Sequence, residues 1–195
     1  MNSLRGLNRR VIEDIEGGRM PRILLTGLPG SGKSTVLLRV VERLRGEGLR
    51  IGGIITPEVR VGGRRVAFKV VDLHSGREGL LASVDRIGGP RVGRYRVDVK
   101  GFEEVALPAL EYAERECDLI CIDEIGRMEL FSQAFRRRVE ELFRSGKPLL
   151  AVVHRDYVRA YGGRGTLIRV TPENREDLVE VITSMIMGER RQREG

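Results

Sequence analysis

The chain has 195 residues, of which 41% are hydrophobic and 32% charged, and its formal net charge is +7. This length and composition indicate one globular domain with a sizeable core. No apolar run approaches the roughly 20 residues of a membrane-spanning helix, and the N-terminus lacks the apolar core of a secretory signal, so we expect a cytoplasmic protein that does not bind membranes. Arginine supplies 31 of the 35 basic residues. Because these arginines are scattered among acids with few aromatic residues between them, they argue against nucleic-acid binding as the main function.

The N-terminal extension, residues 1–19, carries a weak helical pattern that ends at two glycines, Gly17 and Gly18. It could pack on the domain as an amphipathic helix. Alternatively, the protein begins at Met20, because a purine-rich ribosome-binding sequence can encode Glu16-Gly17-Gly18. We therefore assign the domain to residues 20–187 and treat residues 188–195 as a charged, frayed tail.

The first half of the domain begins with a short strand, a glycine-rich turn and an amphipathic helix. The strand covers residues 23–26, and the apolar face of the helix includes Val36, Val40 and Leu44. Four further strands are predicted between residues 51 and 99, separated by glycine-containing turns; they cover 51–55, 65–73, 79–82 and 94–99. Such short connections indicate antiparallel pairing, in a region that is either grafted onto the main sheet or continues it.

The second half alternates helices and strands. A helix is predicted at 102–116, where Pro108 either kinks it or marks its first turn. A second helix is predicted after a cap at Ser132, and a third from Thr171-Pro172 to Met187. Apolar strands are predicted at 119–122, 149–153 and 166–170. The sequence thus predicts an α/β fold with a mostly parallel central sheet, flanked by helices and carrying an antiparallel region inserted at about 51–99.

The turn after the first strand reads GLPGSGKST and matches the phosphate-binding pattern G-x-x-x-x-G-K-[ST] between a strand and a helix. Its glycines let backbone N–H groups surround a phosphate, and the N-terminus of the helix adds positive potential. Lys33 is expected to reach the β- and γ-phosphates, and the Ser34 hydroxyl to bind Mg²⁺. The predicted nucleotide-binding residues of the loop are Gly27, Leu28, Pro29, Gly30, Ser31, Gly32, Lys33, Ser34 and Thr35.

Two adjacent carboxylates, Asp123 and Glu124, follow the apolar run at 119–122. Like charges this close raise each other's pKa, so we expect a metal ion or a reacting water between them and the loop. In phosphate-loop proteins an acid at the end of a second strand binds Mg²⁺, which assigns Asp123 to the nucleotide and the metal. Glu124 is then the candidate base that activates water, with Lys33 as the second catalytic residue.

Several stretches together resemble a known family. These are GLPGSGKST, GGIITPEVR with GGRRVAFKVVDL, GRYRV, and CIDEIGRMEL with a downstream Phe135. The combination is similar to the thermophile nucleoside-triphosphatase family, also called cancer-related nucleoside-triphosphatase, from about Met20 to the closing helix; residues 1–19 depart from it. The resemblance implies a RecA-like P-loop NTPase fold and Mg²⁺-dependent hydrolysis of several nucleoside triphosphates, among them ATP, GTP, CTP and UTP.

Weaker candidates lie near the same predicted sheet edge. They are His154 after the strand at 149–153, Arg155, Arg159 and Arg164 in the following loop, Arg60 in TPEVR, and Glu129, which the resemblance supports without naming a role. Two other functions stay open from the residues alone. A small nucleotide or nucleoside kinase uses the same loop, and a nucleotide-dependent RNA-associated switch would hydrolyse nucleotide only to reset its binding state.

Overall fold

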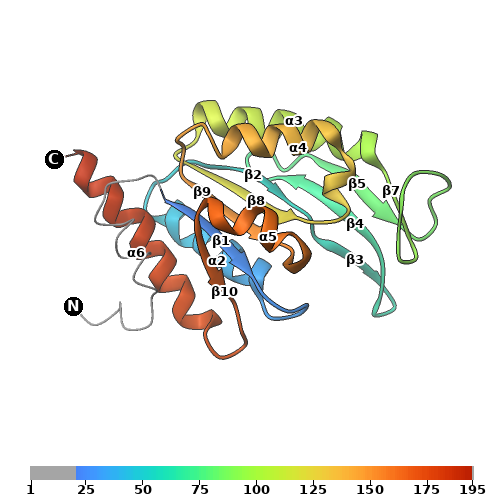
Figure 1. Ribbon diagram of the computed structural model, residues 1–195, viewed down its shortest axis with the longest axis horizontal. Coiled ribbons are helices and arrows are strands. Elements are labelled where there is room, and N and C mark those ends of the chain that lie inside the picture. Colours follow the sequence, from blue (N-terminus) through green and yellow to red (C-terminus); the bar gives the residue numbers. More distant parts are fainter. Residues whose placement is uncertain (1–20, 195) are drawn as a thin grey trace.

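The structure is a computed structural model that describes residues 21–194 (Figure 1). The predicted N-terminal helix and the alternative start at Met20 lie outside the described residues. One continuous sheet of ten strands, in the order β10-β1-β9-β8-β2-β4-β5-β7-β6 with β3 paired to β4, runs through the molecule. Among the described residues, no helix is long and apolar enough to cross a membrane.

The first half of the sheet is parallel, as predicted. Its strands are β1 (Arg22–Thr26), β2 (Ile51–Ile55), β8 (Leu119–Ile125), β9 (Leu149–Val153) and β10 (Thr166–Arg169). Every residue of β9 is buried, which explains its uninterrupted apolar sequence. The strand order places β9 between β1 and β8, so the loop after β1 and the acids of β8 share one edge of the sheet.

Helices cover both faces of the parallel half. α3 (Val99–Glu116) and α4 (Gln133–Leu142) pack on one face, where Phe102 and Phe135 meet edge to face at 5.0 Å. α2 (Lys33–Gly46) and α6 (Arg175–Glu194) pack on the other face, and a short α5 (Val158–Tyr161) follows β9. Successive strand residues alternate between these two cores, which fixes the register of each strand.

The antiparallel half continues the main sheet rather than forming a separate unit. β4 (Arg64–Asp72) pairs with β2 on one side and with β5 (Glu78–Ser83) on the other, and β6 (Arg91–Val92) and β7 (Tyr95–Val97) complete the far end. β3 (Glu58–Val61), which pairs only with β4, was not predicted: its charged residues and valines alternate, but it is only four residues long and none of them is buried. β7 ends earlier than predicted because Asp98 already caps α3 by accepting a hydrogen bond from the Gly101 N–H.

Other predicted boundaries were also wrong. β8 does not end at 122 but runs through both acids to Ile125. α3 begins at Val99, so Pro108 lies inside the helix and not in its first turn. α6 begins at Arg175 instead of at Thr171-Pro172, because the Asn174 side chain accepts a hydrogen bond from the Thr171 N–H and holds a turn there; the helix then continues past 187 to Glu194. The predicted cap at Ser132 is confirmed, since its hydroxyl accepts a hydrogen bond from the Phe135 N–H.

Candidate active site

The loop between β1 and α2 has the backbone shape that a phosphate site needs. Gly32, immediately before α2, has a φ of 97°, which residues with a Cβ rarely adopt. At Gly27 a Cβ would lie 2.4 Å from the Val170 carbonyl oxygen, so a larger residue would displace the loop. These two glycines keep the loop folded tightly against the N-terminus of α2.

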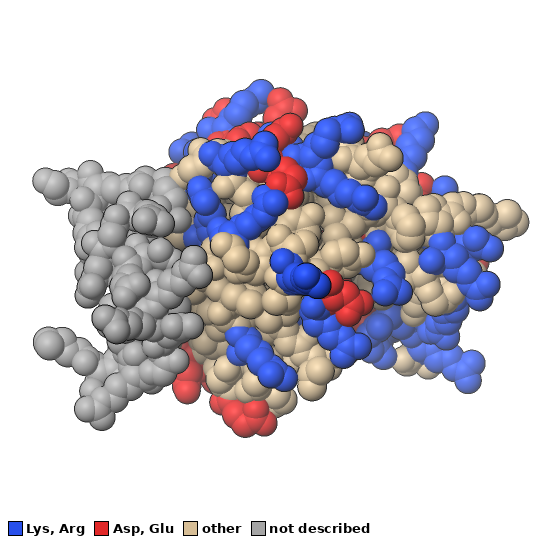
Figure 2. Space-filling model, in the orientation of Figure 1, with Lys and Arg blue, Asp and Glu red and all other residues tan. Residues whose placement is uncertain are grey.

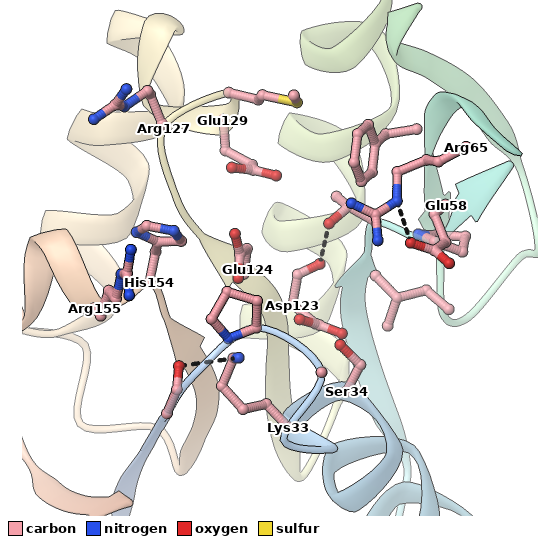
Figure 3. Close-up of a pocket in the computed structure, with 18 of the residues that line it drawn as sticks. Lys33, Ser34, Glu58, Arg65, Asp123, Glu124, Arg127, Glu129, His154 and Arg155 are labelled. Atoms are coloured by element: carbon pink, nitrogen blue, oxygen red, sulfur yellow. Dashed lines mark hydrogen bonds and ion pairs between the residues drawn. The ribbon is translucent and has the colours of Figure 1, made fainter. Parts of the chain in front are cut away.

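Lys33 and Ser34 lie in the first turn of α2 and face the pocket (Figure 3). The Lys33 ammonium folds back over the loop and donates hydrogen bonds to the carbonyl oxygens of Gly27 (3.2 Å) and Leu28 (2.9 Å). The Ser34 side chain lies beside the Asp123 carboxylate (Figure 3). The start of α2 and the acids of β8 therefore meet in one pocket.

Asp123 and Glu124 both line the pocket, and the peptide bond between them is cis. Burial raises the pKa of Asp123 to about 6, although the neighbouring Ser34 hydroxyl and the charge of Lys33 oppose this shift. Burial and then the charge of Asp123 raise the pKa of Glu124 to about 7, opposed by Lys33. Glu124 therefore has a pKa close to neutrality and lies near the loop lysine.

Glu129, the candidate without a role, lies on the same pocket wall as Glu124. A 3-10 turn (Glu129–Phe131) brings the chain back toward the end of β8. A Cβ added to Gly126 would lie 2.6 Å from a Glu124 carboxylate oxygen and 2.9 Å from a Glu129 carboxylate oxygen, so the two carboxyl groups are close to each other. The Glu129 carboxyl is 3% exposed, and burial together with the charge of Glu124 raises its pKa well above the usual value. The Thr56 hydroxyl donates to the Asp123 carbonyl oxygen at 2.8 Å and also contacts the Glu129 carboxyl.

A wall of basic side chains faces these acids from the ends of β8 and β9 (Figure 3). His154 and Arg155 line the pocket together with Arg127, which sequence analysis missed because no motif spacing singles it out. The Asp156 carboxylate lies 3.4 Å from the Arg127 guanidinium, 3.6 Å from His154 Nδ1 and 3.8 Å from Arg155 Nε. Burial lowers the pKa of His154, so its imidazole is mainly neutral at pH 7.

Three predicted arginine candidates do not line the pocket. Arg164 pairs with Glu140 and lies against the rings of Phe143 and Tyr161, and Arg159, on α5, is not among the lining residues. Arg60 does not line the pocket itself, although it forms an ion pair with Glu58, which does.

The pocket has a volume of about 440 Å³ and lies between the two halves of the sheet. The parallel half supplies the loop and the acids. The antiparallel half supplies a far wall that sequence analysis missed, made of Glu58, Arg65, Phe68 and Val92. Glu58 there pairs with both Arg60 and Arg65, which lowers its pKa (Figure 3).

The donors at the loop fit Mg²⁺. Among residues 21–194 no cluster of three or more His, Cys, Asp or Glu side chains is arranged to hold a metal ion. The Ser34 hydroxyl and the Asp123 carboxylate, which lie beside each other in the pocket, both offer oxygen ligands. Mg²⁺ at nucleotide sites takes one or two such protein ligands and completes its shell with phosphate and water oxygens.

The chain is similar to solved structures and to curated protein sequences. The chain superposes on the crystal structure of THEP1 from the hyperthermophile Aquifex aeolicus with a TM-score of 0.75 and 36% identity, covering 85% of this chain and 98% of that one. It matches the solution structure of a human cancer-related nucleoside triphosphatase with a TM-score of 0.71 and 35% identity, covering 85% and 97%. Nucleoside-triphosphatase THEP1 of Methanothermobacter thermautotrophicus is 52% identical over 157 residues, covering 80% of this chain and 90% of the relative. The family model described as NTPase matches residues 22–183, and the chain therefore belongs to the THEP1 family of nucleoside-triphosphatases, with the P-loop type of α/β fold.

Proposed function

We propose that the chain hydrolyses ATP, GTP, CTP and UTP to the nucleoside diphosphate and phosphate, in a reaction that requires Mg²⁺. The observation that carries this proposal is the largely buried Glu124 carboxylate, which lines the same pocket as the loop lysine, Lys33. The relatives named as nucleoside-triphosphatases support the reaction class. Hydrolysis of all four nucleotides is compatible with a loop that contacts phosphates and not bases.

Binding begins at the loop. The Lys33 ammonium, which two loop carbonyls hold over the loop, is placed to contact the β- and γ-phosphates, and backbone N–H groups at the start of α2 contact the other oxygens. Ser34 and Asp123 would hold the metal ion, which when bound neutralises charge on the phosphate oxygens. These residues position the γ-phosphate toward Glu124.

Glu124 then acts as the general base. It takes a proton from a water whose oxygen attacks the γ-phosphorus, while the bond from that phosphorus to the bridging oxygen breaks and the diphosphate leaves. A pKa near 7 suits this role, because a base works best when its pKa lies close to the working pH.

Arg127 and Arg155 can supply the positive charge that such reactions need. Both line the pocket on the wall beyond Glu124, and Asp156 contacts both guanidinium groups. An arginine that faces the transferred phosphoryl group contributes about 10³- to 10⁵-fold in enzymes that use one. The chain would thus carry its own arginines for this purpose.

The experiment follows the label of γ-labelled ATP, GTP, CTP and UTP with Mg²⁺ or with EDTA, with and without added nucleosides and nucleoside monophosphates. Free labelled phosphate from all four nucleotides, released only with Mg²⁺ and at a rate independent of acceptors, supports the proposal. Label that appears on an acceptor faster than in phosphate shows a kinase and removes the role given to Glu124.

A further inference from the structure

Basic side chains gather on the antiparallel half of the molecule. Figure 2 shows lysine and arginine crowded around the end that carries β3, β4 and β7 in Figure 1. We define the hairpin patch as the six exposed arginines of two short segments, 58–65 and 91–96: Arg60, Arg64, Arg65, Arg91, Arg94 and Arg96. Glu58 is the one acid within these segments. Scattered arginines in the sequence are therefore concentrated by the fold.

The two hairpins that carry the patch lie side by side. The Arg94 guanidinium and the Tyr95 hydroxyl both hydrogen-bond to the Arg65 carbonyl oxygen, which joins β7 to the start of β4 across 29 and 30 residues of sequence. Arg65 from one hairpin and Val92 from the other also line the pocket. The patch is thus one surface, and it continues into the mouth of the active-site pocket.

Most of the charge of the patch is not neutralised within the protein. Glu58 pairs with Arg60 and Arg65. In the described part of the chain, the other four arginines have no carboxylate within ion-pair distance, and three of them bond only to neutral groups: backbone carbonyl oxygens and, for Arg94, also the Tyr95 hydroxyl. Exposed guanidinium groups without acidic partners attract phosphates.

Aromatic rings lie where the patch meets the pocket. Phe68, which lines the pocket, packs edge to face on Tyr95 at 5.2 Å. Guanidinium groups of the patch lie near both rings, Arg65 at 5.4 Å from the centre of Phe68 and Arg94 at 5.4 Å from the centre of Tyr95. A track of cations beside aromatic rings is the usual composition of a surface for single-stranded nucleic acid, in which phosphates contact the cations and bases stack on the rings.

We propose that the hairpin patch binds single-stranded nucleic acid and places a base against Phe68 at the mouth of the pocket. A lipid surface fits less well, because a membrane-binding face needs a broad apolar area. Among the described residues, the large apolar side chains that are exposed on this half are Val61 and Ile87. The proposal concerns a partner and not the hydrolysed substrate, so it stands or falls independently of the proposed function.

The test measures binding of a fluorescent oligouridylate of about 12 nucleotides by anisotropy, without nucleotide, between about 50 and 200 mM salt. Four phosphate contacts predict a slope of about −2.8 for log K against log salt. The double variant Arg64→Gln/Arg91→Gln should make the slope shallower by about 1.4 and weaken binding about 25-fold at 0.1 M salt. Neither residue lines the pocket, so the double variant should hydrolyse nucleotide at the wild-type rate. That activity would also show that the variant is folded.

The matched control is Arg43→Gln/Arg144→Gln, which removes the same charge from exposed sites on α2 and just after α4. It should bind like the wild type. Stacking on Phe68 further predicts that an abasic oligonucleotide of equal length binds the wild type at least about fivefold more weakly. Equal losses in both double variants, no salt dependence, or tighter binding of polyglutamate or of phosphatidylserine-containing vesicles than of oligouridylate would each overturn the proposal.

Discussion

Replacing Glu124 with glutamine tests the assignment of the general base, because the substitution keeps size and shape and removes the charge. Loss of a general base costs about 10²- to 10⁴-fold in rate, or about 2.7 to 5.4 kcal/mol of barrier. Nucleotide binding should be unchanged or tighter, since the variant removes a carboxylate whose negative charge would repel the phosphates. The assays are phosphate release at saturating ATP with Mg²⁺ and equilibrium titration with a fluorescent nucleotide.

Glu58→Gln is the matched control. Glu58 lines the far wall of the same pocket, but it pairs with Arg60 and Arg65 and does not face the loop. The control should hydrolyse ATP at nearly the wild-type rate. A Glu124→Gln variant that keeps nearly full activity would refute the mechanism, and if Glu129→Gln were inactive at the same time, the base would be Glu129.

Three further changes test other parts of the structure. Lys33→Ala should abolish turnover and weaken binding of the fluorescent nucleotide, because the ammonium is the one loop side chain that can contact the β- and γ-phosphates; unchanged titration would contradict this. The pKa of Glu129 is raised in the folded protein, so the folded state binds this proton more tightly than the unfolded chain, in which the pKa of Glu129 is near 4.5. The free energy of unfolding should therefore fall as pH rises above that value toward the folded pKa, by up to about 1.4 kcal/mol per pH unit. Urea denaturation of Glu129→Gln without metal or nucleotide should show a flatter pH profile, and an identical profile would show that Glu129 is not the cause. At Gly53, whose φ is +116°, a Cβ would lie 1.9 Å from the Cys121 carbonyl oxygen, so Gly53→Ala should lower the free energy of unfolding by about 3 kcal/mol or more. The control is Gly48→Ala, where φ is +84° and the space around a Cβ is free, and it should cost about 1 kcal/mol.

The buried part of the fold could be predicted from the sequence, and the exposed part could not. The strand at 149–153 is buried on both faces, so its apolar run alone identifies it. β3 is a four-residue edge strand with no buried residue, so its alternation of charged residues and valines is too short to distinguish it from a loop. The start of α6 was misplaced because the Asn174 side chain bonds to the backbone and competes with helix formation, an outcome that depends on local geometry.

The site divides in the same way. Lys33 and Ser34 lie in one contiguous motif, and Asp123 and Glu124 end a buried strand, so pattern and position indicate both groups. The far wall of the pocket comes from β3, β4 and β6, which reach the site only through the order of strands in the sheet. Arg127 likewise reaches the pocket because β8 extends beyond the predicted end and the chain then turns back. Residues that the strand order brings together are not marked by any regular spacing in the sequence.

The two adjacent acids differ in what surrounds them, and this difference separates their roles. Both are buried, which raises both pKa values, and Lys33 opposes the shift in each. Only Asp123 also has the Ser34 hydroxyl beside its carboxylate, and that hydroxyl favours the ionised form. Glu124 instead feels the charge of Asp123, so it holds its proton to higher pH. A metal ligand must be ionised and a general base must take up a proton, so one hydroxyl in the first turn of α2 makes Asp123 suited to the first task and leaves Glu124 suited to the second.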